Sequence, residues 1–333
     1  MPEQSPDSGE EIVRTLVADE QRHDLPADEP SLLIAAVEAG PEIAHNRRRR
    51  KGLGIGAWLA IIWISLLLFS AIFQPLLVST GVIPDPEAQE LPEISGTGEA
   101  LVVAQPPSLG HLMGLNPRGE DILSLVIEGS RRSLVIGFVS VFLGFMVGGF
   151  LGLLAGYFKG RTGGFIGSLL DILLAFPQLI LALFVVEVLG HTVTNVTFAL
   201  AIVSTPVLAR IARASSLSWS EREFVVAARA QGAKHRRVLW REVLPNTLPA
   251  MLSIALLGVA VVIVAEAGLA LLGAGVAPDL VTWGNIIQTG VPELKDSPHI
   301  VLAPSIVIFL TVLALNYLGD VVRARFDVRE AAL

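Results

Sequence analysis

The sequence has no cysteine, few charged residues and few aromatic residues. Without cysteine the chain can form no disulfide bond, no thiolate nucleophile and no cysteine-ligated zinc or iron–sulfur centre. Charged residues make up 17% of the chain, against about 25% in soluble proteins. Hydrophobic residues make up 52% of the 333 residues, and the mean hydropathy is +0.64. These values argue against a soluble enzyme and favour a membrane protein.

Charge is unevenly distributed along the chain. Residues 1–45 hold eleven carboxylates and two arginines, whereas residues 46–333 hold twenty-two basic and twenty acidic side chains. A nucleic-acid-binding protein would concentrate basic charge in a folded domain, so this function is excluded. We expect residues 1–46, rich in Asp, Glu and Pro, to form a disordered acidic tail.

Six stretches are long and apolar enough to span a bilayer, which requires about 20 residues. The sequence therefore predicts an all-α integral membrane protein with six transmembrane helices. The predicted spans are Leu53–Phe73, Leu134–Phe158, Phe165–Leu189, Val193–Ala212, Leu248–Leu272 and Ile300–Leu318.

Basic residues gather on one side of these spans. If the N-terminus is inside, the four clusters next to the spans on the cytoplasmic side hold seventeen Lys and Arg, and the opposite segments hold four. The positive-inside rule therefore places both termini in the cytoplasm. This orientation divides the chain into a tail (1–46), a basic anchor with the first span (47–73), an external loop (74–133), a five-helix core (134–320) and a cytoplasmic tail (321–333). Within the loop, Ile122, Leu125, Val126 and Gly129 predict an amphipathic helix at the outer membrane interface.

The second span carries glycine at every fourth position. Such a stripe lets helices approach closely in lipid. The partner of this packing face could be another helix of the same chain or a second subunit. The stripe is Gly144, Gly148, Gly152 and Gly156.

Residues 213–246, between the fourth and fifth spans, form the most informative segment. We expect two short helices around a break at Gly232, with Ser218 or Ser220 capping the first and Pro245 ending the second. Ala227 and its alanine neighbours leave a low-relief surface that another protein could approach. A hairpin this small has no core of its own, which favours docking onto a partner.

This segment resembles the "EAA" loop of binding-protein-dependent ABC importers. Ala227-Ala228, Gly232 four residues later and Leu244-Pro245 twelve residues after that glycine carry the resemblance. The chain is further similar to the C-type subunit of dipeptide/oligopeptide/nickel permeases over residues 108–328. The matching stretches are Leu217–Ala233, Leu244–Asn246, Ala265–Leu269 with Gly273, Thr282–Asn285 and Leu310–Asp320 with Arg323 and Asp327.

Two parts of the family pattern differ in this chain. Val226 stands where the family has the glutamate of the loop, and Glu242 replaces an apolar residue before Leu-Pro, with Glu221 and Glu223 nearby. The external motif, usually Gly-Thr-Asp-x-x-Gly-Arg-Asp, matches at only three positions. They are Gly114, Gly119 and Asp121.

The resemblance implies a type I ABC importer permease fold that imports di- or oligopeptides across a bacterial cell membrane by alternating access. It implies a second homologous permease, two ABC ATPase subunits and an extracytoplasmic binding protein as partners. This chain has no Gly-x-x-x-x-Gly-Lys-Ser/Thr sequence to cradle phosphates, so ATP and Mg are assigned to the ATPases, and no cofactor to this chain. The implied coupling residues are Glu221, Arg222, Glu223, Ala227, Ala228, Gly232, Ala233, Lys234, Leu244 and Pro245.

Ionisable residues inside spans are candidates for the translocation path. Glu266, flanked by small residues in the fifth span, could face a cavity and attract a peptide amino group, or contact a neighbouring helix. Asp171 could line the path or pair with Arg161 or Arg210. No catalytic constellation or metal-ligand cluster is evident in the sequence. A nickel or other small-substrate permease and an ATPase-independent secondary transporter remain alternatives.

The predicted orientation can be tested by thiol labelling of this cysteine-free chain. Cysteine in Gly96→Cys and in Gln288→Cys should react with a membrane-impermeant reagent in intact cells. Cysteine in Lys234→Cys should react only after permeabilisation. Labelling of Lys234→Cys in intact cells would contradict the orientation.

Overall fold

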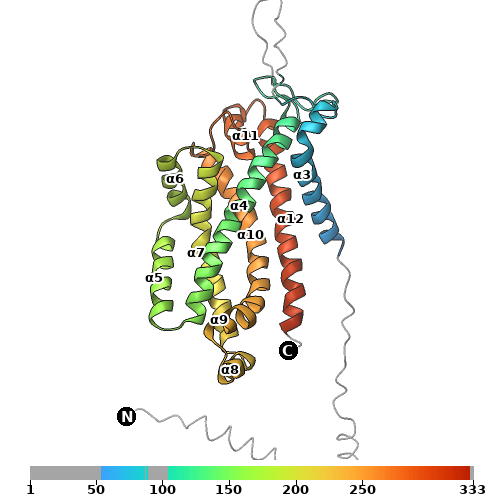
Figure 1. The fold of residues 1–333 in the computed structure, drawn as a ribbon. Coiled ribbons are helices and arrows are strands. Elements are labelled where there is room, and N and C mark those ends of the chain that lie inside the picture. Colours follow the sequence, from blue (N-terminus) through green and yellow to red (C-terminus); the bar gives the residue numbers. More distant parts are fainter. Residues whose placement is uncertain (1–53, 87, 89–103, 331–333) are drawn as a thin grey trace, which may run out of the picture. The chain divides into compact units, whose positions relative to one another are not determined.

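The computed structural model describes residues 54–86, 88 and 104–330, which are almost entirely helical (Figure 1). Within them, extended backbone pairs only at one bridge, between Leu115 and Asp121. The elements are α3 (Ile55–Ser79), α4 (Ile122–Tyr157), α5 (Arg161–Ala175), α6 (Gln178–Leu189), α7 (Val193–Ser220), α8 (Glu223–Ala230), α9 (His235–Val238), the π-helix η1 (Leu239–Val243), α10 (Leu244–Leu271), α11 (Trp283–Gly290), the 3₁₀ helix η2 (Val291–Glu293) and α12 (His299–Glu330). The predicted acidic tail lies outside the described residues.

The predicted all-α, six-span architecture is confirmed, with different helix ends. Five helices of the described residues are long and apolar enough to cross a membrane, and the bent pair α5 and α6 together has the length and hydropathy of a sixth span. The first span continues to Ser79, six residues beyond the predicted end. The last helix continues to Glu330, well into the segment predicted as a tail.

The separate helix predicted at the outer interface is wrong. Residues 122–133 are the first turns of the 36-residue helix α4, because no helix-breaking residue separates them from the second span. The predicted apolar stripe is buried against protein. Gly129 packs on the backbone of Thr282 and Trp283, and the indole nitrogen of Trp283 donates a 2.9 Å hydrogen bond to the carbonyl of Val126.

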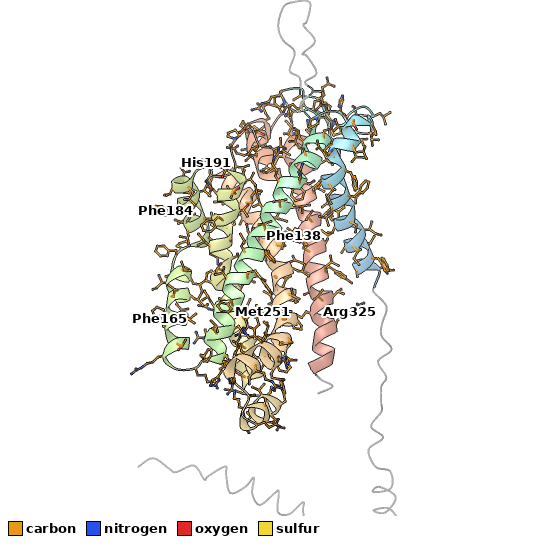
Figure 2. All side chains as sticks on the ribbon, in the orientation of Figure 1. Phe138, Phe165, Phe184, His191, Met251 and Arg325 are labelled. Carbon is orange, nitrogen blue, oxygen red and sulfur yellow. The ribbon has the colours of Figure 1, made fainter. Side chains whose placement is uncertain are left out.

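The third span is broken. A single helix was predicted over Phe165–Leu189, but the chain bends by 85° between α5 and α6. Pro177 cannot donate a helical hydrogen bond, and the residue before it, Phe176, is extended with ψ 137°. Phe165 on α5 and Phe184 on α6 both point away from the rest of the bundle (Figure 2).

The glycine stripe of α4 meets α7 of the same chain, which decides between the two predicted partners. A Cβ at any of the four positions would overlap atoms of α7. The two backbones therefore lie in direct contact along four turns, in the manner of small-residue packing in membranes. The atoms opposite the stripe belong to Ser204, Thr205, Ala209, Ala212, Arg213, Ser216 and Leu217.

The contact can be tested by adding one methyl group. In Gly152→Ala the new Cβ would collide with the carbonyl of Ala209 and lie 2.7 Å from the Cβ of Ala212, so α7 must move. We expect a loss of about 1–3 kcal/mol in stability, measured by thermal unfolding of the purified complex. Gly164→Ala, which meets nothing within 4 Å, is the control and should be neutral or stabilising. Equal unfolding temperatures for both variants would contradict this packing.

Candidate functional site: the cytoplasmic platform

The segment between α7 and α10 folds into a small platform, residues 221–243, formed by α8, α9 and η1. In Figure 1 it lies beyond the ends of the long helices, on the side where the C-terminus of α12 emerges. This is the cytoplasmic side by the positive-inside rule. The platform is the part of the described chain that a cytoplasmic protein would meet first.

The platform packs on a hydrophobic cluster that it shares with α4 and α7, in keeping with the prediction that the hairpin has no core of its own. Side chains from the ends of α4 and α7 pack there with side chains from the platform. The buried members are Leu153, Tyr157, Trp219, Val225, Val238, Leu239 and Val243. Burying these side chains ties the platform to the two membrane helices, each contributing about 1.5–3 kcal/mol.

Polar contacts reinforce the attachment to the end of α4. The hydroxyl of Tyr157 and Nδ1 of His235 are 2.9 Å apart, and the guanidinium of Arg229 lies 4.8 Å from the centre of the tyrosine ring. The ammonium of Lys159 donates a 2.5 Å hydrogen bond to Glu221, and this bond holds the pKa of the Glu221 carboxyl below its ordinary value. The end of α4 therefore contacts Arg229 of α8, and the turn after α4 contacts Glu221, two residues before α8.

The break predicted at Gly232 is present. This glycine has φ +83°, and its N–H donates to the carbonyl of Arg229 while the N–H of Ala233 donates to the carbonyl of Ala228. The two bonds form a Schellman motif, which satisfies the last carbonyls of α8. A Cβ at this position would meet no neighbour within 4 Å, so crowding does not explain the glycine. The left-handed backbone conformation does, because other residues adopt it at a cost.

Two predicted helix ends are wrong. Ser218 and Ser220 do not cap α8, because α7 runs to Ser220, and Arg222 occupies the N-cap position without a side-chain bond. Pro245 does not end a helix either. It lies at the start of α10, directly after the π-helix η1, and helix runs on from His235 to Leu271.

The predicted coupling residues divide into an exposed face and an attached face. Ala228, Ala233 and Leu244 pack on the cluster beneath the platform. The others are exposed: Glu221, Arg222, Glu223, Ala227, Gly232, Lys234 and Pro245. The exposed face also carries two apolar side chains. They are Val226 (53% exposed), which replaces the family glutamate, and Phe224 (42% exposed), which was not singled out from the sequence.

The two carboxylates predicted inside the membrane have different surroundings. Asp171 of α5 forms a 2.9 Å ion pair with Arg210 of α7, one of the two predicted partners. Glu266 is fully buried, and neither carboxyl oxygen has a hydrogen-bond partner in the described part of the chain. Of the two alternatives stated for this side chain, this conformation shows the contact with a neighbouring helix, because α11 lies over it. A Cβ on Gly284 would lie 3.3 Å from Oε1.

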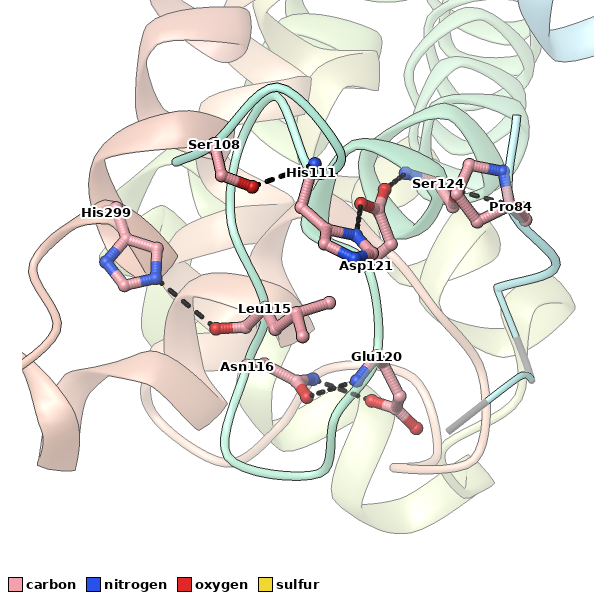
Figure 3. Close-up of polar contacts among 9 residues, drawn as sticks. All are labelled: Pro84, Ser108, His111, Leu115, Asn116, Glu120, Asp121, Ser124 and His299. Atoms are coloured by element: carbon pink, nitrogen blue, oxygen red, sulfur yellow. Dashed lines mark hydrogen bonds and ion pairs between the residues drawn. The ribbon is translucent and has the colours of Figure 1, made fainter. Parts of the chain in front are cut away.

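The external turn explains why only three positions match the family motif. Gly114 and Gly119 have φ of +82° and +77°, which disfavours side chains. Asp121 accepts a 2.9 Å hydrogen bond from the N–H of Ser124, capping α4, and lies 2.9 Å from Nδ1 of His111 (Figure 3). The matching residues are those that the turn and the cap require. His111 was not singled out from the sequence.

Comparison with known proteins identifies the family to which this chain belongs. Residues 148–331 match the family model described as "Binding-protein-dependent transport system inner membrane component". The match covers more than half of the chain, so the protein belongs to this family of ABC transporter permeases. It is a membrane transport subunit of a multi-pass inner membrane system, and not an enzyme.

Relatives of this chain include permeases that are named for the transport of peptides or glutathione. The chain is 32% identical over 317 residues to the dipeptide transport system permease protein DppC of Alkalihalophilus pseudofirmus, covering 95% of this chain and 97% of that protein. It is 34% identical to the di/tripeptide permease protein DppC of Pseudomonas aeruginosa, covering 92% and 96%. The glutathione permease protein GsiD of Pectobacterium atrosepticum is 37% identical over 66% of this chain and 73% of that protein.

A solved structure supports the fold. The structure of the MetNI methionine ABC transporter, in an inward-facing conformation, aligns with a TM-score of 0.53 over 61% of this chain and 97% of the matched chain. The sequence identity is 21%. The predicted ABC importer permease fold is thereby confirmed.

The turn at Gly232 can be tested by substitution. Gly232→Asn should keep the platform, because asparagine tolerates the left-handed region, whereas Gly232→Val should strain it by about 1–2 kcal/mol. Hydrogen exchange of the Ala233 amide, which closes the motif, is the measurement. Faster exchange in Gly232→Val alone is expected, and equal exchange in both variants would contradict the role of this backbone conformation.

Proposed function

We propose that this chain is one of two homologous permease subunits of an ATP-driven importer of di- or oligopeptides. Two ABC ATPases dock on the cytoplasmic side, bind ATP with Mg, and move the spans between inward-open and outward-open states. An extracytoplasmic binding protein delivers the peptide. Family membership supports the transport role, and the names of the relatives support the peptide substrate.

The geometry of the platform is the observation that carries this proposal. Its exposed face is formed by α8, with apolar Phe224 and Val226 beside the small Ala227 and the charged Arg222 and Glu223. Such a mixture suits a reversible protein interface. Its other face packs on the ends of α4 and α7, so a force on α8 reaches the membrane helices through close-packed side chains.

The substrate class rests on a weaker basis than the transport role. The names of the relatives range from dipeptide and di/tripeptide to glutathione permeases. Nickel or another small substrate is the alternative from the same class of transporter. We retain Glu266 and Asp171 as candidates for the translocation path. Glu266 could reach a substrate only if α11 moves from α10, since the carboxyl group is enclosed here. Ligand binding by the cognate extracytoplasmic protein would decide the substrate.

A secondary transporter that works without ATPases is the alternative from another class. The break between α5 and α6 is a feature found in such transporters. A docking platform on the cytoplasmic side has no role in that mechanism, and the family match favours the ATP-driven system.

Docking can be tested with a charge placed on α8. In Ala227→Asp, a docked ATPase would bury the new carboxylate without an opposite charge. This should weaken docking by several kcal/mol of binding free energy. We expect loss of ATPase co-purification and of substrate-stimulated ATP hydrolysis. Membrane insertion and substrate capture by the binding protein should be unchanged. This position is preferable to Ala228, which packs on the cluster and would perturb the platform itself.

The matched control is Thr162→Asp, which places the same carboxylate at an exposed position at the cytoplasmic start of α5, outside the platform. It should retain the ATPases and full uptake. Normal ATPase retention and uptake in Ala227→Asp would refute the docking role and return the secondary transporter to favour.

A further inference from the structure

A groove of about 420 Å³ opens between α3 and α4. Its lining residues recur at helical spacing, so each helix contributes one continuous face to it. From α3 come Leu68, Ala71, Ile72 and Pro75, and from α4 come Arg131, Leu134 and Val135.

The groove lies toward the outer ends of the two helices. Helix α3 ends outside at Ser79, one turn beyond Pro75, and α4 begins outside at Ile122 (Figure 1). Arg131 lies nine residues into α4, about 14 Å along its axis, and directly before the apolar run that begins at Leu134. The guanidinium is therefore at the outer edge of the hydrocarbon region, where lipid phosphates lie.

The groove is apolar except for this cation. Ala71 and Leu134 are 5% and 4% exposed and form its floor, whereas Leu68, Ile72 and Val135 are exposed along its sides. The surface is thus open to whatever surrounds the helices in the membrane.

Arg131 has no ion pair or hydrogen bond to any residue that the structure describes. The next residue is different. Arg132 donates a 2.7 Å hydrogen bond to Glu128 and a 3.2 Å bond to the carbonyl of Val281. Glu128, the nearest carboxylate along the helix, is therefore engaged by Arg132, and the positive charge of Arg131 faces the groove and its surroundings uncompensated.

We propose that this groove is a binding site for an outer-leaflet phospholipid, with the lipid phosphate on Arg131 and an acyl chain along the apolar faces of α3 and α4. A guanidinium forms strong, paired hydrogen bonds with a phosphate group. An apolar protein helix in the same place would bury the guanidinium without a counter-charge, which is costly. The bound lipid fills the space between α3 and α4 and holds the first span against the core.

The experiment uses the complete transporter in nanodiscs of phosphatidylethanolamine and phosphatidylglycerol, with a trace of phosphatidylglycerol that carries a photoreactive acyl chain. After irradiation, labelled peptides are mapped by mass spectrometry. We expect labelling at residues 68–75 of α3. Arg131→Gln should lower this labelling several-fold, and Arg131→Lys, which keeps the charge, should retain most of it.

Arg118→Gln is the matched control, because Arg118 is exposed on the external turn, has no side-chain ion pair in the described part of the chain and does not line the groove. It should leave the labelling unchanged. Equal labelling in Arg131→Gln and the natural chain would overturn the proposal. So would cross-linking of a benzoylphenylalanine at position 72 to the second permease, because the groove would then be a subunit interface.

Discussion

The structure depends on the contact between α4 and α7, in which two helix backbones meet directly. Lipid offers little hydrophobic drive for helices to associate, so close packing at small residues must supply much of the attraction. The stripe from Gly144 to Gly156 makes that approach possible. The same two helices end beneath the platform, at Tyr157 and Trp219, and both aromatic side chains are buried in its supporting cluster. The position of the platform is therefore determined by a contact within the membrane.

Hydropathy predicted the spans well because a bilayer imposes a simple rule: backbone groups must be satisfied within the segment that crosses it. The break between α5 and α6 was missed because Pro177 and Gln178 are flanked on both sides by apolar residues, so the mean hydropathy of the segment stays high. Proline alone would not have revealed it, since Pro206, Pro249 and Pro304 lie inside unbroken helices. Whether a proline breaks a helix depends on the neighbours that compensate for it.

In the platform too, features set by one residue could be predicted from the sequence, and features set by tertiary contacts could not. The turn at Gly232 could be predicted because the need for glycine is local, in the backbone of one residue. The supporting cluster could not, since it joins residues from three separate parts of the chain. The enclosure of Glu266 also depends on tertiary structure, because α11 covers it from a segment that follows the span. Charge and spacing identified these residues without specifying what would surround them.

The break between α5 and α6 leaves backbone polar groups of the single chain without helical hydrogen bonds. Helices α5 and α6 are about 22 Å and 18 Å long, each shorter than a hydrocarbon core of about 30 Å. The junction at Phe176 and Pro177 therefore falls at a depth where no water competes for backbone polar groups. Irregular backbone is tolerated there only against protein or a water-filled space, yet Phe176, Leu179 and Ile180 around the junction are exposed. In a membrane, the backbone polar groups of the junction therefore require protein or water beside them, and not lipid.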